Sequence, residues 1–286
     1  METEQWRNQL GEQFHFVHFR GIAPCENTLL LIHHGHGEHI RRYDGLATRL
    51  SQMPIDVRGF DCRGHGLSVG GQGCAENLDE LVTDLETVID AMMEKSGATQ
   101  LIIFAHSMGA AVLCHYLANR IPHAALSGVI LSAAALHFPR TPIVNIKLFA
   151  ARFLRRLAPT LTMETGLDPS GISTVPEEVQ RYKNDPLIHG KLTSGFGLSL
   201  VNHGNGISTT APRITTPLLV YHGTADPICG IQGSRQLVKH ATNAQVDYHE
   251  FEGYYHELHH ESQDDAGRVF DLIVEWLTPK LTQNAK

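Results

Sequence analysis

Short apolar runs alternate along the chain with longer amphipathic stretches. Residues 101–104 and 218–222 are mostly apolar and predict buried strands, whereas residues 77–93 repeat apolar side chains at the spacing of a helix. The other predicted strands cover residues 14–19, 28–33, 55–61, 127–131 and 246–251, and the other predicted helices cover residues 41–51, 108–120, 231–240 and 265–277. Strands separated by helices indicate βαβ units, so we expect an α/β fold with a mostly parallel central sheet and helices on both faces. We expect the first two strands to pair as a hairpin.

One segment interrupts this alternation. Residues 137–212 contain seven of the 13 prolines, and proline breaks regular structure. We predict that the segment is an inserted helical cap over the carboxyl edge of the sheet, where the active sites of α/β proteins lie. The predicted organisation is therefore residues 1–136 as the N-terminal part of the core, 137–212 as the cap, and 213–286 as the C-terminal part of the core.

A helix is predicted within the cap, at residues 144–157. One face of this helix carries the apolar residues Ile146, Phe149, Phe153 and Leu157. Its basic residues lie mostly on other faces and are Lys147, Arg152, Arg155 and Arg156. The apolar stripe has two interpretations that the sequence leaves open. It packs the cap onto the sheet, or it lines the entrance to the site and touches a lipid surface while the basic residues face anionic headgroups.

The turn after residues 101–104 carries the main chemical signal. Ala105, Ser107 and Gly109 form a small-x-Ser-x-Gly pattern between that strand and the helix at residues 108–120. This is the context of a nucleophile elbow, with alanine in place of the first glycine. Small residues on either side let the turn pack closely while the serine hydroxyl projects outward. We therefore predict Ser107 as a nucleophile.

A serine nucleophile needs a histidine base, and the histidine needs a carboxylate that fixes its tautomer. Asp226 follows the strand at residues 218–222, and His256 is the first histidine after the strand at residues 246–251. The order serine, acid, histidine is that of the α/β-hydrolase fold. Weaker candidates, because they lie inside a strand or in the next turn, are Asp247, Glu250, His259 and His260.

A tetrahedral intermediate also needs two N–H donors for its negatively charged oxygen. One is expected from the backbone of Met108, the residue after the nucleophile. The other is expected from the backbone of His36, because Gly35 and Gly37 on either side allow close approach. We predict His36 and Met108 as the oxyanion hole.

Length and charge narrow the class of protein. The 286 residues suffice for one large α/β domain with an insertion, and a net charge of −7 gives no reason to expect nucleic acid as a partner. No signal segment is evident at the start, and no apolar run approaches the roughly 18 residues of a membrane span. The five cysteines are odd in number and widely spaced, which is typical of reduced thiols, and Cys229 is expected near the acid loop. We expect a cytoplasmic protein, with at most a weak, peripheral contact between the cap and a membrane.

The 19 histidines raise the question of a metal. Residues 256–260 match the HExxH pattern of zinc metalloproteases, which places two histidine ligands on one face of a helix. Here the pattern follows a strand and a Gly-Tyr-Tyr loop, and no third ligand follows at a standard spacing. We therefore predict no metal and no other cofactor, with a zinc hydrolase as a minor alternative.

The candidate residues lie in motifs that resemble those of the monoglyceride lipase and lysophospholipase group of capped α/β-hydrolases. The matching motifs are HGHGEH at 34–39, RY at 42–43, DCRGHGLS at 61–68, AHSMG at 105–109, DPL at 185–187, HGTAD at 222–226 and YHEL at 255–258. The resemblance extends over nearly the whole chain. It implies a triad of Ser107, Asp226 and His256, with His36 and Met108 as oxyanion donors.

The resemblance implies a serine ester hydrolase that cleaves single-chain acyl esters through an acyl-enzyme, with a small lipid or ester as its ligand. Alternatives are a general carboxylesterase for small esters and a non-catalytic binding protein of the same fold. An intact serine, acid and histidine argue against a non-catalytic binding protein. The chain departs from the group at Ala105 and at His36, where small or apolar residues are usual. We interpret the DCRGHGLS motif as architectural, with Asp61 and Arg63 paired near the edge of the site.

Overall fold

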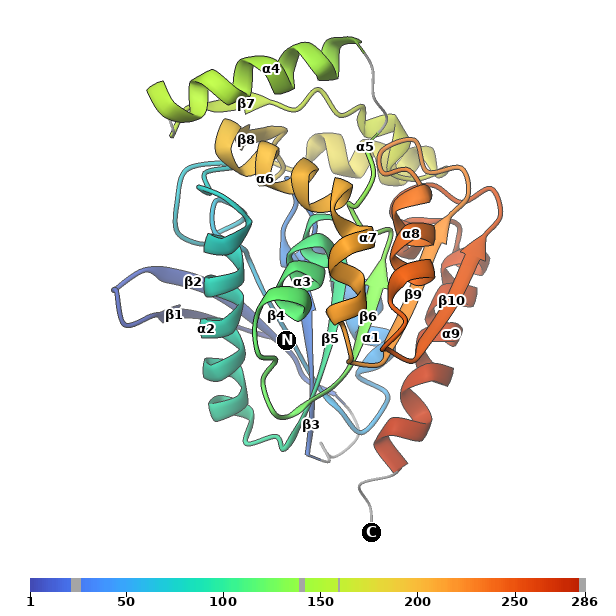
Figure 1. The fold of residues 1–286 in the computed structure, drawn as a ribbon. Helices are drawn as coiled ribbons and strands as arrows, with labels where there is room; N and C mark the ends of the chain where they lie inside the picture. The colour runs from blue at the N-terminus through green and yellow to red at the C-terminus, as the bar shows by residue number, and fades with distance from the viewer. Residues whose placement is uncertain (22–26, 139–141, 159, 283–286) are drawn as a thin grey trace.

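The computed structural model describes residues 1–21, 27–138, 142–158 and 160–282. Within these residues, eight strands form one sheet in the order β1-β2-β4-β3-β5-β6-β9-β10 (Figure 1). The six strands from β4 to β10 in this order are parallel, and β1 and β2 are antiparallel to their neighbours. The strands are β1 (Glu2–Arg7), β2 (Gln13–Phe19), β3 (Thr28–His33), β4 (Asp56–Phe60), β5 (Gln100–His106), β6 (Leu126–Ser132), β9 (Leu218–Gly223) and β10 (Val246–Phe251). The predicted α/β-hydrolase architecture is confirmed.

Helices cover both faces of the sheet because its central strands are apolar on both faces. In β3, Leu29 and Leu31 belong to one buried cluster, whereas Leu30 and Ile32 belong to the other. This is the period of two that a strand imposes on its side chains. The helices on the first face are α2 (Leu78–Ser96), α3 (Met108–Asn119) and α8 (Gln232–His240), and those on the second face are α1 (Asp44–Leu50) and α9 (Gln263–Thr282).

The predicted hairpin between the first two strands is wrong. β2 pairs with β1 and β4, while β3 lies between β4 and β5. All six residues of β3 are buried, so this strand requires neighbours on both sides and occupies the interior of the sheet. β1 was not predicted, because every residue of this strand except Trp6 is exposed and no apolar alternation marks it. The predicted connection through Pro24 lies outside the described residues.

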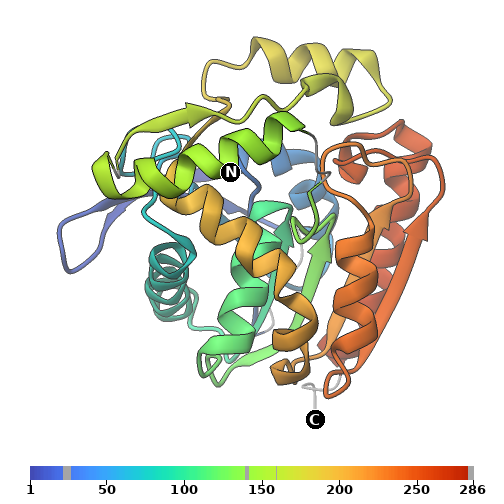
Figure 2. The same ribbon diagram turned by 45° about the horizontal axis from the view of Figure 1, so that its top comes forward.

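The segment between β6 and β9 lies over one end of the sheet (Figures 1 and 2). It includes a two-stranded antiparallel sheet of β7 and β8 and several short helices. Its last elements, from α6 onward, also pack against α3. The elements of the segment are α4 (Pro142–Leu157), β7 (Thr162–Glu164), η2 (Pro169–Gly171), α5 (Pro176–Asn184), β8 (Lys191–Thr193), α6 (Ser194–Asn205), α7 (Ile207–Thr210) and η3 (Ala211–Arg213).

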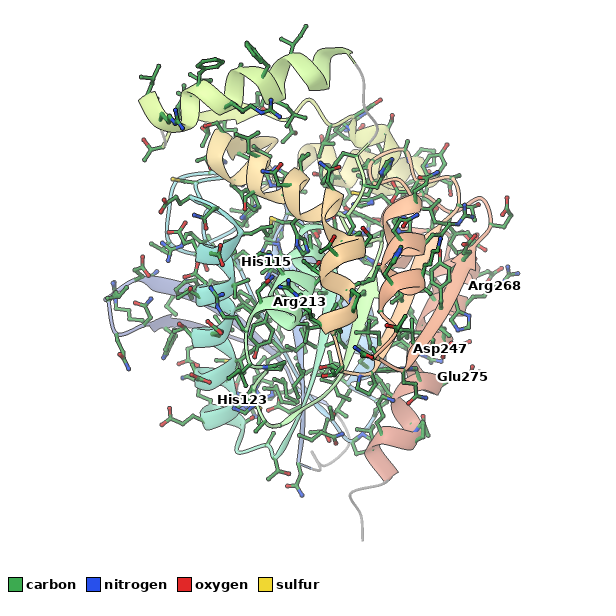
Figure 3. All side chains as sticks on the ribbon, in the orientation of Figure 1. His115, His123, Arg213, Asp247, Arg268 and Glu275 are labelled. Carbon is green, nitrogen blue, oxygen red and sulfur yellow. The ribbon has the colours of Figure 1, made fainter. Side chains whose placement is uncertain are left out.

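Helix α4 confirms the predicted helix but excludes one interpretation of its apolar stripe. The stripe residues are exposed, at 67% for Ile146, 62% for Phe149, 58% for Phe153 and 82% for Leu157. The helix packs on α6 instead, and among its described side chains Ala151 is buried. Side chains of α4 therefore project away from the rest of the protein (Figure 3). The interpretation that the stripe packs the segment onto the sheet is wrong.

The basic residues of this helix are only partly described. Arg152 and Arg156 are exposed, whereas the side chains of Lys147 and Arg155 lie outside the described part of the chain. Among the described residues, none of the helices combines the length and apolar character needed to cross a membrane.

Candidate active site

Ser107 occupies a strained turn between β5 and α3. Its backbone has φ 52° and ψ −115°, in the region that non-glycine residues rarely adopt. A Cβ at Gly109 would lie 2.4 Å from His33 Nδ1 and 2.6 Å from the His34 carbonyl oxygen, so only glycine fits there. Ala105 is fully buried, which explains why this position needs a small residue. The turn has the geometry predicted for a nucleophile elbow.

The structure brings the three predicted residues together. His256 Nε2 lies 2.9 Å from Ser107 Oγ, and His256 Nδ1 lies 2.7 Å from Asp226 Oδ2. Asp226 lies in the loop after β9 and His256 in the loop after β10, as the sequence predicted. All three side chains come from the carboxyl ends of parallel strands, so they converge at one edge of the sheet.

The carboxylate of Asp226 accepts hydrogen bonds at both oxygens. Oδ1 accepts from the backbone N–H groups of Ile228 at 2.8 Å and Cys229 at 3.0 Å, while Oδ2 faces ring nitrogens of His256 and His222. Burial raises the pKa of Asp226, but the nearby His256 and the two ring hydrogen bonds outweigh burial and lower it. The lowered pKa keeps the carboxylate of Asp226 ionised at neutral pH.

The base has a raised pKa. Burial lowers the pKa of His256, but the charge and hydrogen bond of Asp226, with the charges of Glu257 and Glu38, raise it above its ordinary value of about 6.5. His256 is almost fully buried, so these charges act through little solvent. The ring is thus a stronger base than an exposed histidine.

The predicted oxyanion loop approaches Ser107 closely. A Cβ at Gly35 would lie 3.1 Å from Ser107 Cβ, and one at Gly37 would lie 2.2 Å from the His189 carbonyl oxygen, where φ is +76°. Glu38 Oε1 accepts a hydrogen bond of 2.6 Å from the Gly35 N–H and fixes the loop. Met108 is the first residue of α3, where backbone N–H groups have no acceptor within the helix. The loop that carries His36 and the first residue of α3 therefore meet beside Ser107.

The side chain of His36 is unusual in this loop. Neither of its ring nitrogens has a hydrogen-bond partner, and the ring packs edge-on against His65 and His189, with centroids 5.5 and 5.8 Å away. Burial, with a smaller contribution from His189, lowers the pKa of His36 to about 3. The ring is therefore neutral at physiological pH and narrows the cavity as a packed side chain.

A buried ion cluster that the sequence did not predict supports the site. Arg42 forms ion pairs with Glu257 and, at 3.3 Å, with Glu38. Its guanidinium also lies over the ring of Tyr182 in α5, 4.9 Å from the centroid. Glu257 directly follows His256, so the cluster ties the histidine loop to the oxyanion loop. The YHEL and HGHGEH motifs contain these carboxylates, but the pairing needs contacts between residues 215 positions apart.

A cavity of about 260 Å³ opens beside Ser107 and His256. It is lined in part by the segment over the sheet, and the apolar members of this lining include Leu167, Ile172 and Ile188. Two polar contacts join the segment between β6 and β9 to the oxyanion loop. His39 Nε2 lies 2.8 Å from Asp185 Oδ2, and the backbone N–H of His189 donates to the Gly37 carbonyl at 2.9 Å. The candidate nucleophile is thus reached through a partly apolar cavity.

The DCRGHGLS motif lies beside the site. The predicted pair of Asp61 and Arg63 is wrong. Arg63 pairs with Glu12 and Asp84. The carboxylate of Asp61 instead accepts hydrogen bonds from the backbone N–H groups of Ile40 and Leu67. The Arg63 guanidinium therefore lies between Asp84 of α2 and Glu12, the residue before β2.

The HExxH segment has no long helix. Only residues 258–260 form a short 3-10 turn. Both ring nitrogens of His256 are bonded to Ser107 and Asp226, and those of His260 to Glu257 and the Arg42 carbonyl. Among the described residues, Glu257, His259 and His260 do bring possible ligand atoms within 4.8 Å of one another, but Glu257 is already paired with Arg42. The arrangement of the zinc motif is not formed.

This fold, with a serine on a strained turn between a central strand and the next helix, is that of the α/β-hydrolases. Residues 25–263 match the family described as serine aminopeptidase, S33. The chain belongs to this family.

Relatives and solved structures agree with this assignment. The monoacylglycerol lipase of Mycolicibacterium smegmatis is 32% identical over 254 residues, which cover 88% of this chain and 89% of that protein. The monoglyceride lipase of Homo sapiens is 30% identical over 269 residues, covering 94% and 88%. The crystal structure of Paleococcus ferrophilus monoacylglycerol lipase matches with a TM-score of 0.81 at 32% identity and covers 92% of this chain and 98% of that one. The protein is a carboxylic ester hydrolase.

Proposed function

We propose that the protein hydrolyses monoacylglycerols and related single-chain esters, with Ser107 as the nucleophile, His256 as the general base and Asp226 as the acid that orients the base. The observation that carries the proposal is a continuous hydrogen-bonded chain. It runs from Ser107 Oγ through both ring nitrogens of His256 to Asp226 Oδ2, with contacts of 2.9 and 2.7 Å. Such a chain lets the imidazole take the hydroxyl proton while the carboxylate stabilises the resulting cation.

The reaction follows from these positions. Ser107 Oγ attacks the ester carbonyl carbon as His256 Nε2 takes its proton, and the backbone N–H groups of His36 and Met108 stabilise the oxygen that becomes negative. The intermediate collapses, and the alcohol leaves with the proton from His256. Water then attacks the acyl-enzyme with the same base, which releases the fatty acid and restores Ser107.

The substrate class rests on the relatives and on the cavity. Two relatives at about 30% identity are named as lipases for monoacylglycerol or monoglyceride. A cavity of about 260 Å³ with apolar lining suits one acyl chain rather than two. Simple short-chain esters would enter the same cavity, so a series of chain lengths separates a lipase from a general esterase.

We further propose that residues 137–212 act as a cap and that α4 docks weakly on lipid. The described part of the chain leaves the four stripe residues exposed, and two more exposed apolar residues, Leu161 and Leu167, belong to the same segment. Leu167 also lines the cavity, so a docked cap would open toward the lipid surface. The exposed Arg152 and Arg156 favour anionic headgroups. Because the chain carries a net charge of −7, the attraction should be local and weakened by salt.

The catalytic proposal is tested by labelling with a fluorophosphonate and by hydrolysis of 1-acylglycerols of graded chain length. Ser107→Ala should abolish labelling and lower turnover by about 10⁴- to 10⁶-fold. Ser170→Ala, which alters an exposed serine of the segment over the site, is the control and should behave as wild type. Near-normal turnover by Ser107→Ala would refute the proposed nucleophile. Faster cleavage of short esters than of long-chain monoacylglycerol would favour a general esterase.

The membrane proposal is tested by co-sedimentation with vesicles of mixed neutral and anionic lipid at low and high salt. The double variant Phe149→Ser/Phe153→Ser should bind less and cleave vesicle-borne monoacylglycerol more slowly. Its control is Leu10→Ser/Ile121→Ser, which removes two exposed apolar side chains outside the segment. Circular dichroism confirms that both variants fold. Equal binding by the two double variants would refute α4 as the docking element.

A further inference from the structure

We infer that His222 is a positioning residue for the proposed triad: it donates a second side-chain hydrogen bond to the acid, fixes the carboxylate and moderates the basicity of His256. The inference rests on the proposed function. His222 is the penultimate residue of β9 and is fully buried, four residues before Asp226. Its Nε2 lies 3.0 Å from Asp226 Oδ2, the oxygen that also faces His256.

The hydrogen positions on His222 follow from its partners. Nε2 faces two acceptors, the Asp226 carboxylate and the Cys229 carbonyl at 2.9 Å, so Nε2 carries a hydrogen. Nδ1 lies 2.8 Å from the hydroxyl of Ser234, a buried residue of α8. The ring is thus anchored at both ends, by a helix on one side and the acid loop on the other. It cannot turn away from Asp226 without breaking three contacts.

Two ring N–H groups therefore share one carboxylate oxygen. Asp226 Oδ2 accepts from His256 at 2.7 Å and from His222 at 3.0 Å, while Oδ1 accepts from two backbone N–H groups. Four donors hold the carboxylate plane, so the oxygen that orients His256 has one position. The second ring donor also draws electron density from Oδ2. This makes Oδ2 a weaker acceptor for His256 and lowers the affinity of that ring for its second proton.

Other charged and titratable groups near the pair must stay constant in the test. His256 faces Asp226 and Ser107, the ring of His106 at a centroid distance of 4.7 Å, and the charges of Glu257 and Glu38. Asp226 faces His222 and His256, and burial together with the charge of Asp226 raises the pKa of the Cys229 thiol. Replacing His222 alone leaves all of these groups in place.

The test compares His222→Leu with His222→Gln. Leucine removes the donor, whereas the glutamine amide can still donate to Asp226. In His222→Leu, the acid limb of kcat/KM should move to higher pH by about 0.5–1, because His256 loses a competitor for Oδ2. kcat should fall by on the order of 10-fold with KM nearly constant, a fraction of the 10²–10⁴ that general base catalysis contributes. His222→Gln should return the acid limb to within about 0.2 of wild type.

The matched control is His203→Leu, which removes another buried histidine with no contact to the triad. It should keep the wild-type acid limb, so a shift in His222→Leu cannot be a general effect of losing a buried ring. An unshifted acid limb in His222→Leu would overturn the inference. So would an equal shift in His222→Leu and His222→Gln.

A measurement on the wild type keeps the inference testable if His222→Leu does not fold. Proton spectra of protein with ¹⁵N-labelled histidine should contain two slowly exchanging ring N–H signals at low field, from His256 Nδ1 and His222 Nε2. The second should disappear in His222→Gln, and its absence from the wild type would overturn the inference. Failure of the proposed function is distinct: Ser107→Ala would then remain active, whatever the behaviour of His222.

Discussion

Replacing Arg42 by leucine should destabilise the protein strongly at neutral pH. Its guanidinium is 5% exposed and pairs with Glu257 and Glu38, whose side chains are 3% and 2% exposed. At 3.3 Å and an effective dielectric of about 20, the pair with Glu38 alone contributes an attraction of about 5 kcal/mol, partly offset by the cost of burying the charges. Removing one member of such a cluster typically costs about 3–5 kcal/mol, because the remaining charges stay buried without a partner.

This magnitude sets the thermal shift to expect. Unfolding entropy of about 2.1 cal/mol/K per residue gives roughly 0.6 kcal/mol/K for a chain of this length, so 3–5 kcal/mol lowers Tm by about 5–8 °C. The control is Arg41→Leu, the neighbouring arginine, which forms a surface pair with Asp44 and is 45% exposed. An exposed pair contributes about 0–1 kcal/mol, so this variant should shift Tm by less than about 2 °C.

The effect should also depend on pH. In the wild type, burial raises the pKa of Glu257, but Arg42 and His260 outweigh burial and lower it, whereas burial and the charge of Glu257 raise the pKa of Glu38. Without Arg42 both carboxyl groups have raised pKa values in the folded state, so the variant gains stability as pH falls and both become neutral. The difference in Tm between wild type and Arg42→Leu should therefore shrink from pH 7.5 to pH 5.5. Equal shifts for Arg42→Leu and Arg41→Leu, or a difference that grows on acidification, would refute the reasoning.

Three further predictions concern the site. Because the pKa of His256 is raised, kcat/KM should fall on acidification with a midpoint above about pH 6.5, and a flat profile from pH 5 to 8 would contradict a histidine base. Activity should survive prolonged dialysis against EDTA, because the ring nitrogens of His256 and His260 already bond protein atoms; loss on chelation with recovery on added zinc would revive a metal mechanism. Burial, with the charge of Asp226, raises the pKa of the Cys229 thiol, so maleimide should label Cys74, which is half-buried, at least about 10-fold faster in the native protein, as peptide mass spectrometry would measure.

The parts of the site that the sequence predicted are those fixed by local chemistry. Ser107 lies between a buried strand and a helix, and Asp226 and His256 each follow a strand directly. In a parallel sheet the carboxyl ends of strands meet at one edge, so local position was enough to bring these residues together. The buried strands were predicted for the same reason, since their apolar runs are continuous.

Pairings between distant parts of the chain were not predictable in this way. The position of β3 beside β4 rather than β2 depends on which strands can bury it from both sides. Arg63 was expected to pair with Asp61, two residues away, but pairs with Glu12 and Asp84 from other elements. Arg42 and Glu257 lie 215 positions apart, and the residues around each of them give no indication that the two pair. Such contacts depend on tertiary packing, which a pattern of residue types does not specify.

Helix α4 shows why an apolar stripe alone does not reveal what covers it. The same periodicity serves a helix that packs on a core and one that lies on lipid, because both environments exclude water from the stripe. The opposite face decides between them. Helix α4 contacts α6 and buries the small residue Ala151, while its large apolar residues stay exposed. A helix with its bulkiest apolar side chains on the face away from its protein contact leaves an apolar surface that a second apolar partner can cover. We propose that this partner is lipid, and the proposal is supported by Leu167, which is exposed and also lines the cavity.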